Sequence, residues 1–186
     1  MRNRYGEIIR YNANKIALRK ALLNQAKQDK NIIYGAQSIN AQVPNIFTRS
    51  TSDYDILTKN SKASANKTEK KFDKIVGDNL FYTKPAMHPG THKVMFIGED
   101  LKQGTKDDFG FVDYTNFPNP MPKYKTINGI RYRSLTEEAR AKRKSLRDKQ
   151  YAFRHAKDRG DLNNIMRYKR FGRFRKWEQH VHQQEW

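Results

Sequence analysis

Two kinds of hydrophobic spacing alternate along this chain, and their order restricts the fold more than any single residue does. Residues 5–27 repeat apolar side chains at the spacing of an amphipathic helix. Residues 31–35 and 53–58 are short apolar runs beside turn residues, which is typical of buried strands. The full order is helix, strand, helix, strand, helix, hairpin, strand and then helices. It predicts the α/β (α+β) class, with a small mixed sheet and flanking helices.

Capping and turn residues set the expected limits of the later elements. Ser64 and Gly77 are the expected start and stop of a helix over 65–76. Two strand-like runs, 91–100 and 109–115, enclose a polar turn and predict a hairpin. Residues 116–125 contain three prolines within five positions, so we expect a loop there.

The C-terminal third is expected to be helical. Ser134 and Glu137 have the spacing of a capping box, which predicts that a helix begins there. A second helix is expected over 149–158 and a third from near Asp161. The sequence therefore divides into a core at 1–133, a helical segment at 134–166 that packs on the core, and a basic aromatic tail at 167–186.

A strong positive charge indicates a polyanionic partner. Lys and Arg number 38 against 19 Asp and Glu, which gives a formal net charge of +19. Residues 131–186 alone hold 17 bases and 7 acids. Such an excess attracts nucleic acid before other partners. The alternative is a basic surface that meets an acidic protein.

Composition excludes several other classes of protein. The chain has no cysteine, which excludes disulfides and thiolate metal sites. No run approaches the ~18–20 apolar residues that a membrane helix needs, and residues 1–15 lack the apolar centre of a signal peptide. We therefore expect a cytoplasmic protein without a membrane partner.

Three acids stand out because of where they fall on the expected strands. Asp53 and Asp55 are two residues apart, so a strand would place both side chains on one face, with Cα atoms about 6–7 Å apart. Asp113 lies within the apolar run 109–115. Three carboxylates on neighbouring strands would suit Mg²⁺. The residues fit equally well a turn cap at Asp53, a solvated Asp55 and an Asp113 paired with an arginine.

Five segments in order resemble the polymerase-β-type nucleotidyltransferase superfamily. They are "YGAQSIN", "RSTSDYDIL", "FVDYT", "INGIRYRSLTEEARAK" and "RHAKDRGDL", and they span about residues 30 to 165. The likeness is greatest to viral poly(A)-polymerase-like proteins and toxin-type nucleotidyltransferases. It implies a nucleotidyltransferase-like fold for 1–133, a nucleoside triphosphate (NTP) substrate and a Mg²⁺ or Mn²⁺ cofactor. If the protein is viral, it also implies the host cytoplasm or the virion as its location.

The resemblance also implies roles for particular residues. Asp53, Asp55 and Asp113 would be the catalytic and metal-binding acids, with Asp113 acting as the base toward the acceptor hydroxyl. Gly35 and Ser38 would hold the triphosphate, and Lys142 would contact a phosphate. The chain departs from the family in two places. Position 36 is Ala where a second Gly is common, and the stretch from 37 to 52 is long.

The tail carries a three-residue repeat of a basic residue followed by an aromatic one. In "RYKRFGRFRKW" the basic residues could grip phosphates and the aromatic rings could stack on bases. The candidate nucleic-acid contacts are Arg170, Arg173, Phe174, Arg175 and Trp177. The alternatives are solvated arginines with Tyr168 and Phe171 packed on the core, or a protein partner or larger assembly bound through the tail.

Taken together, these features predict a metal-dependent nucleotidyltransferase that moves a nucleoside monophosphate from an NTP to a hydroxyl, such as an RNA 3′ end. The alternative is a non-catalytic, basic nucleic-acid-binding or virion structural protein built on the same fold.

Overall fold

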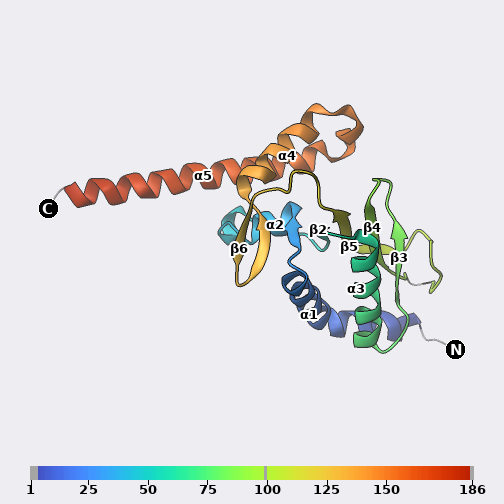
Figure 1. Ribbon diagram of the computed structural model, residues 1–186. Coiled ribbons are helices and arrows are strands. Elements are labelled where there is room, and N and C mark those ends of the chain that lie inside the picture. Colours follow the sequence, from blue (N-terminus) through green and yellow to red (C-terminus); the bar gives the residue numbers. More distant parts are fainter. Residues whose placement is uncertain (1–3, 99, 185–186) are drawn as a thin grey trace.

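A seven-stranded mixed sheet forms the centre of the computed structural model, which describes residues 4–98 and 100–184, with side chains from 12 to 98 and from 100 to 172. The strands lie in the order β3-β4-β5-β2-β1-β7-β6 (Figure 1). Their bounds are β1 (Ile32–Tyr34), β2 (Tyr54–Thr58), β3 (Phe81–Pro85), β4 (Thr91–Phe96), β5 (Phe109–Asn116), β6 (Tyr124–Ile127) and β7 (Ile130–Arg133). β2 is parallel to β5 and β1 to β7, whereas the other four neighbouring pairs are antiparallel. The predicted α/β class with a mixed sheet is confirmed.

Helices on the two sides of the sheet create two separate cores. The helices are α1 (Arg4–Gln28), α2 (Gly35–Asn40), α3 (Ser61–Val76), α4 (Leu135–Arg147) and α5 (His155–Gln184), with short 3-10 turns η1 (Asn45–Phe47) and η2 (Lys149–Arg154). α1 and α3 lie on the opposite side of the sheet from α4 and α5 (Figure 1). The larger core joins α1 and α3 to the sheet and includes Leu22, Phe72 and Tyr114. The smaller one, around Ile165, joins α2, η1, α4 and α5.

The start of α3 differs from the prediction, while its end agrees. Asn60, rather than Ser64, is the N-cap, and its side chain accepts a hydrogen bond from the Ala63 N–H. Ser64 lies inside the helix, where its hydroxyl is 2.7 Å from that of Thr58. Gly77 ends the helix in the left-handed conformation, with φ of 75°, which glycine adopts without a steric penalty.

Two strands, β3 and β6, were not predicted from the sequence, because neither has an apolar face. β3 is only partly buried beyond Phe81, and it pairs with β4 at the edge of the sheet. β6 is an exposed edge strand that begins at Tyr124, within the segment expected to be a loop. A turn at Asn128 and Gly129, both with positive φ, joins β6 to β7. Asn-Gly between apolar residues is a strong hairpin signal, so this pair could have been recognised.

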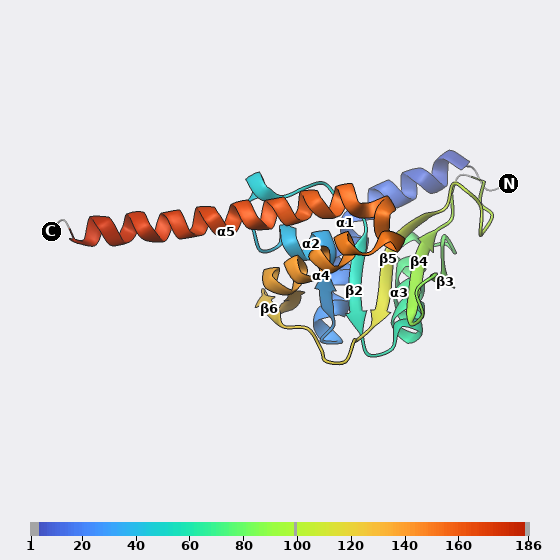
Figure 2. The ribbon, with the colours of Figure 1, turned by 90° about the horizontal axis from the view of Figure 1, so that it is seen from above.

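The C-terminal helices also differ from the prediction. Residues 149–154 form the 3-10 turn η2, and a single helix, α5, then continues from His155 to Gln184 without a break at Gly160. α5 continues well past the body of the molecule (Figure 2). Within the described chain, none of the helices combines the length and the hydropathy needed to cross a membrane.

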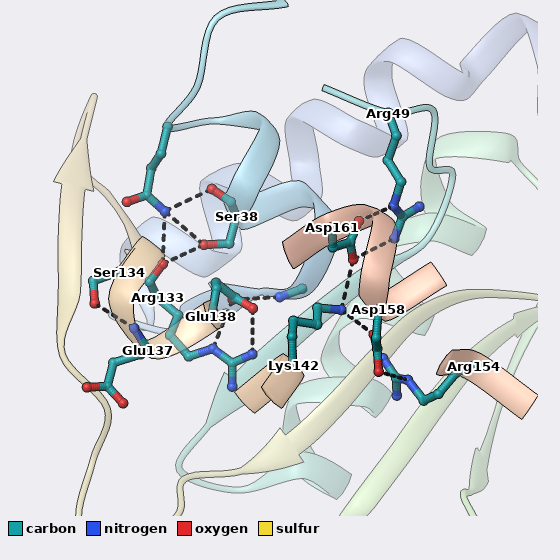
Figure 3. A network of polar contacts seen from close by, with 12 residues as sticks. Ser38, Arg49, Arg133, Ser134, Glu137, Glu138, Lys142, Arg154, Asp158 and Asp161 are labelled. Carbon is teal, nitrogen blue, oxygen red and sulfur yellow. Dashed lines mark hydrogen bonds and ion pairs between the residues drawn. The ribbon is translucent and has the colours of Figure 1, made fainter. Parts of the chain in front are cut away.

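Glu138 in α4 forms the first part of a buried ionic network that fastens α4 to the sheet. This carboxylate is inaccessible to solvent and pairs with the Arg133 guanidinium at 2.7 Å. It also accepts a hydrogen bond from the Gly35 N–H at 2.8 Å. α4 is therefore held against both β7 and the start of α2 (Figure 3).

Lys142 forms the second part of the network and joins α4 to α5. Its ammonium lies 2.8 Å from carboxylate oxygens of both Asp158 and Asp161, and all three side chains are buried. Arg49 pairs with the outer side of Asp161 and Arg154 with that of Asp158 (Figure 3). Burial raises the pKa values of both acids, but the hydrogen bonds and charges of these cations outweigh it, so both pKa values lie below the ordinary range.

The network gives a stability prediction. Lys142→Met leaves two buried carboxylates without their shared ammonium, so we expect the free energy of unfolding to fall by about 3–5 kcal/mol. Lys144→Met, at an exposed position on the same helix, should change it by less than ~0.5 kcal/mol. Urea denaturation followed by circular dichroism measures both. Equal losses in the two variants would contradict a structural role for Lys142.

Candidate functional site

Strand register places four polar side chains in one row across the middle of the sheet. Asp55 of β2 is the Cα partner of Asp113 of β5 on one side and of Tyr34 of β1 on the other. Asp113 is in turn the partner of Lys93 of β4. Residues that face each other across neighbouring strands point to the same face of the sheet. The row therefore runs Lys93, Asp113, Asp55, Tyr34, with two carboxylates at its centre.

Asp53 adds a third carboxylate just before β2. Its side chain is exposed, and one oxygen accepts a hydrogen bond from the Thr51 hydroxyl. Burial tends to raise the pKa of Asp53, but the Thr51 hydrogen bond and the positive charge of Lys157 outweigh it, so the pKa lies below its usual value. Asp53 therefore carries a full negative charge next to the row.

Asp55 is the most perturbed acid of the site. Burial, followed by repulsion from Asp53 and from Asp113, raises its pKa from 3.8 to about 7, although Arg154 opposes this with its positive charge. Within the described residues, no group donates a hydrogen bond to the Asp55 carboxylate or forms an ion pair with it. A half-buried carboxylate between two others, with no direct partner, is a position at which a cation would be stabilised.

Lysine and arginine side chains stand around these acids. The Lys93 ammonium lies 3.0 Å from Asp113, and both side chains are about one-third exposed. Arg154 of η2 and Lys157 of α5 act on Asp55 and Asp53 through their charges. The end of η2 and the first turn of α5 therefore contribute positive charge near the acids.

The carboxylates fit a divalent cation only in part. Among the side chains described, at 12–98 and 100–172, no group of three or more His, Cys, Asp or Glu is arranged to hold a metal ion. Mg²⁺, however, is usually bound by one or two carboxylates together with water and substrate phosphates. Asp55 and Asp113 are adjacent, repel each other and offer the oxygen ligands that this ion requires. The pair thus fits magnesium held jointly with a phosphate, and it does not form an all-protein cage.

Gly35 lies directly against the acid pair. Its φ is +70°, and a Cβ atom at this position would overlap the Asp55 carboxylate, so only glycine fits here. Its N–H group already donates to Glu138. Gly35 thus allows the backbone to approach Asp55, while its amide is engaged inside the protein.

Ser38 and Lys142 make contacts inside the protein, away from the carboxylate row. Ser38 is fully buried, and its hydroxyl donates to the backbone carbonyl of Arg133 at 2.7 Å. Lys142 is enclosed by Asp158 and Asp161. The structure therefore brings together Asp53, Asp55, Asp113 and Gly35 from the predicted set, and directs Ser38 and Lys142 into the interior.

The predicted nucleic-acid contacts lie along α5. Arg170 is exposed on this helix. Arg173, Phe174, Arg175 and Trp177 belong to its backbone, but their side chains lie outside the described residues. For the first two aromatic residues of the tail, the alternative was packing on the core. This packing is present, because Tyr168 and Phe171 both contact the Phe47 ring.

Sequence reasoning missed the cations of the site. Lys93 faces Asp113 only because the β4–β5 register shifts between Val94 and Met95, and a bulge of this kind cannot be counted from a turn length. The charges of Arg154 and Lys157 act on the acids because the chain returns to them at η2 and α5. No local pattern in "FRHAKD" signals that proximity.

Comparisons with known proteins agree with the fold. No known protein-family pattern matches the chain, and no curated protein sequence matches it. Among solved structures it is similar to the Megavirus polyadenylate synthase, with a TM-score of 0.63 and 14% identity over 84% of this chain and 32% of that one. It is also similar to JHP933 from Helicobacter pylori, with a TM-score of 0.50 and 13% identity over 81% of this chain and 63% of that one. The chain thus spans about a third of the polyadenylate synthase (32%) and has a nucleotidyltransferase-like fold.

Proposed function

We propose that the protein is a metal-dependent nucleotidyltransferase that transfers a nucleoside monophosphate from an NTP to a hydroxyl group of a nucleic acid. The observation that carries the proposal is the pairing of Asp55 with Asp113 on parallel strands, with Gly35 packed against the Asp55 carboxylate. The polyadenylate synthase similarity supports an NTP substrate and an RNA 3′ end as acceptor.

The chemistry requires one bond to form and one to break. The acceptor oxygen forms a bond to the α-phosphorus, the bond between that phosphorus and the α–β bridging oxygen breaks, and pyrophosphate leaves. The half-buried Asp113 carboxylate accepts the hydroxyl proton. Asp55 and Asp113 would hold a magnesium ion, which would supply positive charge for the phosphate oxygens.

Basic side chains around the acids support the binding of a triphosphate. The charge of Arg154 acts on Asp55 and that of Lys157 on Asp53, and both charges would also favour phosphate oxygens above the row. Arg154 pairs with Asp158 but remains 41% exposed. Lys142 is enclosed by two carboxylates, so we assign phosphate contact to Arg154 and Lys157 in its place.

The second candidate is a nucleic-acid-binding protein without turnover. One observation favours it: the Lys93 ammonium already neutralises Asp113, as an ammonium would in a site that no longer takes a metal. A net charge of +19 is compatible with either candidate. Only the nucleotidyltransferase would show turnover, so a turnover assay separates the two.

Substitution of the paired acids gives the direct test. With labelled NTP, Mg²⁺ and an oligonucleotide acceptor, we expect Asp55→Asn and Asp113→Asn each to lower the rate of product formation about 100-fold or more. Asp78→Asn, which removes a surface acid outside the row, should retain the wild-type rate. Wild-type product that persists in both row variants would remove the mechanism, and absence of product with every acceptor would favour the second candidate.

The raised pKa of Asp55 predicts a dependence of stability on pH. The folded protein holds the proton of this group more tightly than the unfolded chain does, so its contribution to stability is lost as pH rises from about 4 to about 7. Asp55→Asn removes that loss. Relative to wild type, it should therefore gain about 1–2 kcal/mol of unfolding free energy between about pH 5 and pH 8 in the absence of metal, a value reduced by solvent screening of a half-buried group.

Urea denaturation in the presence of a chelator at the two pH values measures this gain, with Asp78→Asn as the control. If the difference between Asp55→Asn and wild type is the same at both pH values, the pKa of Asp55 is not raised in the folded protein.

Metal binding should be visible without any reaction. At about pH 8, we expect millimolar Mg²⁺ or Mn²⁺ to raise the melting temperature of the wild type by about 2–5 °C and to leave Asp55→Asn unchanged. Lys93→Met should show a larger shift than wild type, because its ammonium no longer competes for Asp113. Lys84→Met is the matched control, since Lys84 is the neighbour of Lys93 on β3. An equal shift in Asp55→Asn and wild type would exclude metal binding at this row.

A further inference from the structure

Two surface hollows meet at Arg49, on the side of the molecule where η1 lies against α5. The first has a volume of about 380 Å³ and lies between α1, α2 and residues 45–51. The second, of about 520 Å³, runs along α5. Arg49 lines both hollows, so they form one surface, which we call the arginine track. Figure 2 shows the segment after α2 beside α5.

The charge of the track is entirely positive. Among the described residues, those that line the two hollows include four arginines and no Asp or Glu. The Asp161 carboxylate pairs with the Arg49 guanidinium and neutralises its charge. The remaining three, Arg19, Arg167 and Arg170, are exposed to solvent. A concave surface with three exposed guanidiniums and no carboxylate selects an anion.

One face of α5 forms the floor of the second hollow. Gly160, Asn163, Asn164, Arg167 and Arg170 line it, and their spacing places them on a single stripe of the helix. Arg167 also lies over the Phe47 ring, with its guanidinium carbon 5.8 Å from the ring centroid. The stripe thus presents small and polar residues toward the start of α5 and cations toward its free end.

Hydrogen-bonding groups, and few apolar ones, complete the lining. Asn40, Asn45, Tyr54 and Tyr132 all contribute to the first hollow. Both tyrosines are buried, and Arg19, which also lines this hollow, acts on the Tyr54 hydroxyl. The apolar side chains of the two linings are Leu23, Ala41 and Met166, a smaller set than the apolar centre of a protein interface usually contains. Amides, phenols and guanidiniums match the phosphates, riboses and bases of a single-stranded nucleic acid.

The track reaches the carboxylates through one residue. Thr51 lines the first hollow, and its hydroxyl donates a hydrogen bond to Asp53. The Gln37 amide, which also lines this hollow, donates to the Thr51 carbonyl. A strand in the first hollow would therefore end next to the acids.

We propose that the arginine track binds the backbone of a single-stranded nucleic acid and leads its end to Asp53. That the bound strand is the acceptor rests on the proposed function. The binding itself does not, because it requires neither metal nor NTP.

Charge-matched variants test the surface. Fluorescence anisotropy with a labelled oligoribonucleotide of about 20 nucleotides, in a chelator and without NTP, measures affinity over a range of salt concentrations. We expect Arg19→Gln/Arg167→Gln/Arg170→Gln to weaken binding at least ~10-fold and to lower the salt slope by about 2–3. Lys62→Gln/Lys74→Gln/Lys125→Gln removes the same charge from exposed positions on α3 and β6 and should weaken binding less than ~3-fold.

An isosteric pair gives a second readout that does not remove any arginine. Asn163→Asp/Asn164→Asp adds two negative charges inside the track, whereas Asn79→Asp/Asn128→Asp adds them outside it. We expect at least ~10-fold weaker binding for the first pair and less than ~3-fold for the second.

Equal losses within either matched set would overturn the proposal, since binding would then follow net charge alone. Equal affinity for a duplex of the same length would overturn its single-strand form. Asp55→Asn should bind as wild type does. If the matched sets differ as expected and the wild type gives no product with any acceptor, the track remains and the proposed reaction fails. If turnover is found and the matched sets are equal, the reaction remains and the track fails.

Discussion

The parallel pairing of β2 with β5 is the constraint on which the candidate site depends. It places Asp55 and Asp113 directly opposite each other, where two carboxylates of like charge destabilise the sheet that holds them. The fold supports this arrangement with an ammonium on Asp113 and the charges of Arg154 and Lys157 nearby. Asp55 itself is left with a raised pKa. The repulsion between these carboxylates is unfavourable in the protein alone and would be relieved by a bound cation. Such repulsion is typical of a site that binds a cation together with a phosphate.

Five acids at and around the candidate site fall into two groups with different partners. Glu138, Asp158 and Asp161 are buried, and each contacts a cation at 2.8 Å or less. They join α4 and α5 to the sheet and have no remaining capacity for a substrate. Asp53 and Asp55 are more exposed and have no such ion pair among the described residues. This contrast explains why Lys142, a basic residue near the expected position of a phosphate contact, is part of the scaffold.

Local sequence was a good guide wherever one face of an element is buried. β1 and β2 were predicted from short apolar runs, and the β4–β5 hairpin from two runs around a polar turn. Local sequence was a poor guide where an element is stabilised by hydrogen bonds to a neighbouring strand and not by a buried apolar face. β6 is an exposed edge strand whose hydrogen bonds come from β7. α5 continues through Gly160, and Lys142 of α4 holds the Asp158 and Asp161 side chains on either side of it.

The sequence by itself determined the fold class, the positive charge and the set of acids at 53, 55 and 113, because hydrophobic period, composition and spacing are properties of neighbouring residues. The tertiary structure alone decided which groups meet. Strand register opposed Asp55 to Asp113, a bulge aligned Lys93 with Asp113, and the return of η2 and α5 brought Arg154 and Lys157 over the acids. These contacts join residues from about 20 to more than 90 positions apart. Burial and charge interactions between residues so far apart in sequence depend on the folded arrangement of the whole chain. They cannot be predicted from the pattern of neighbouring residues.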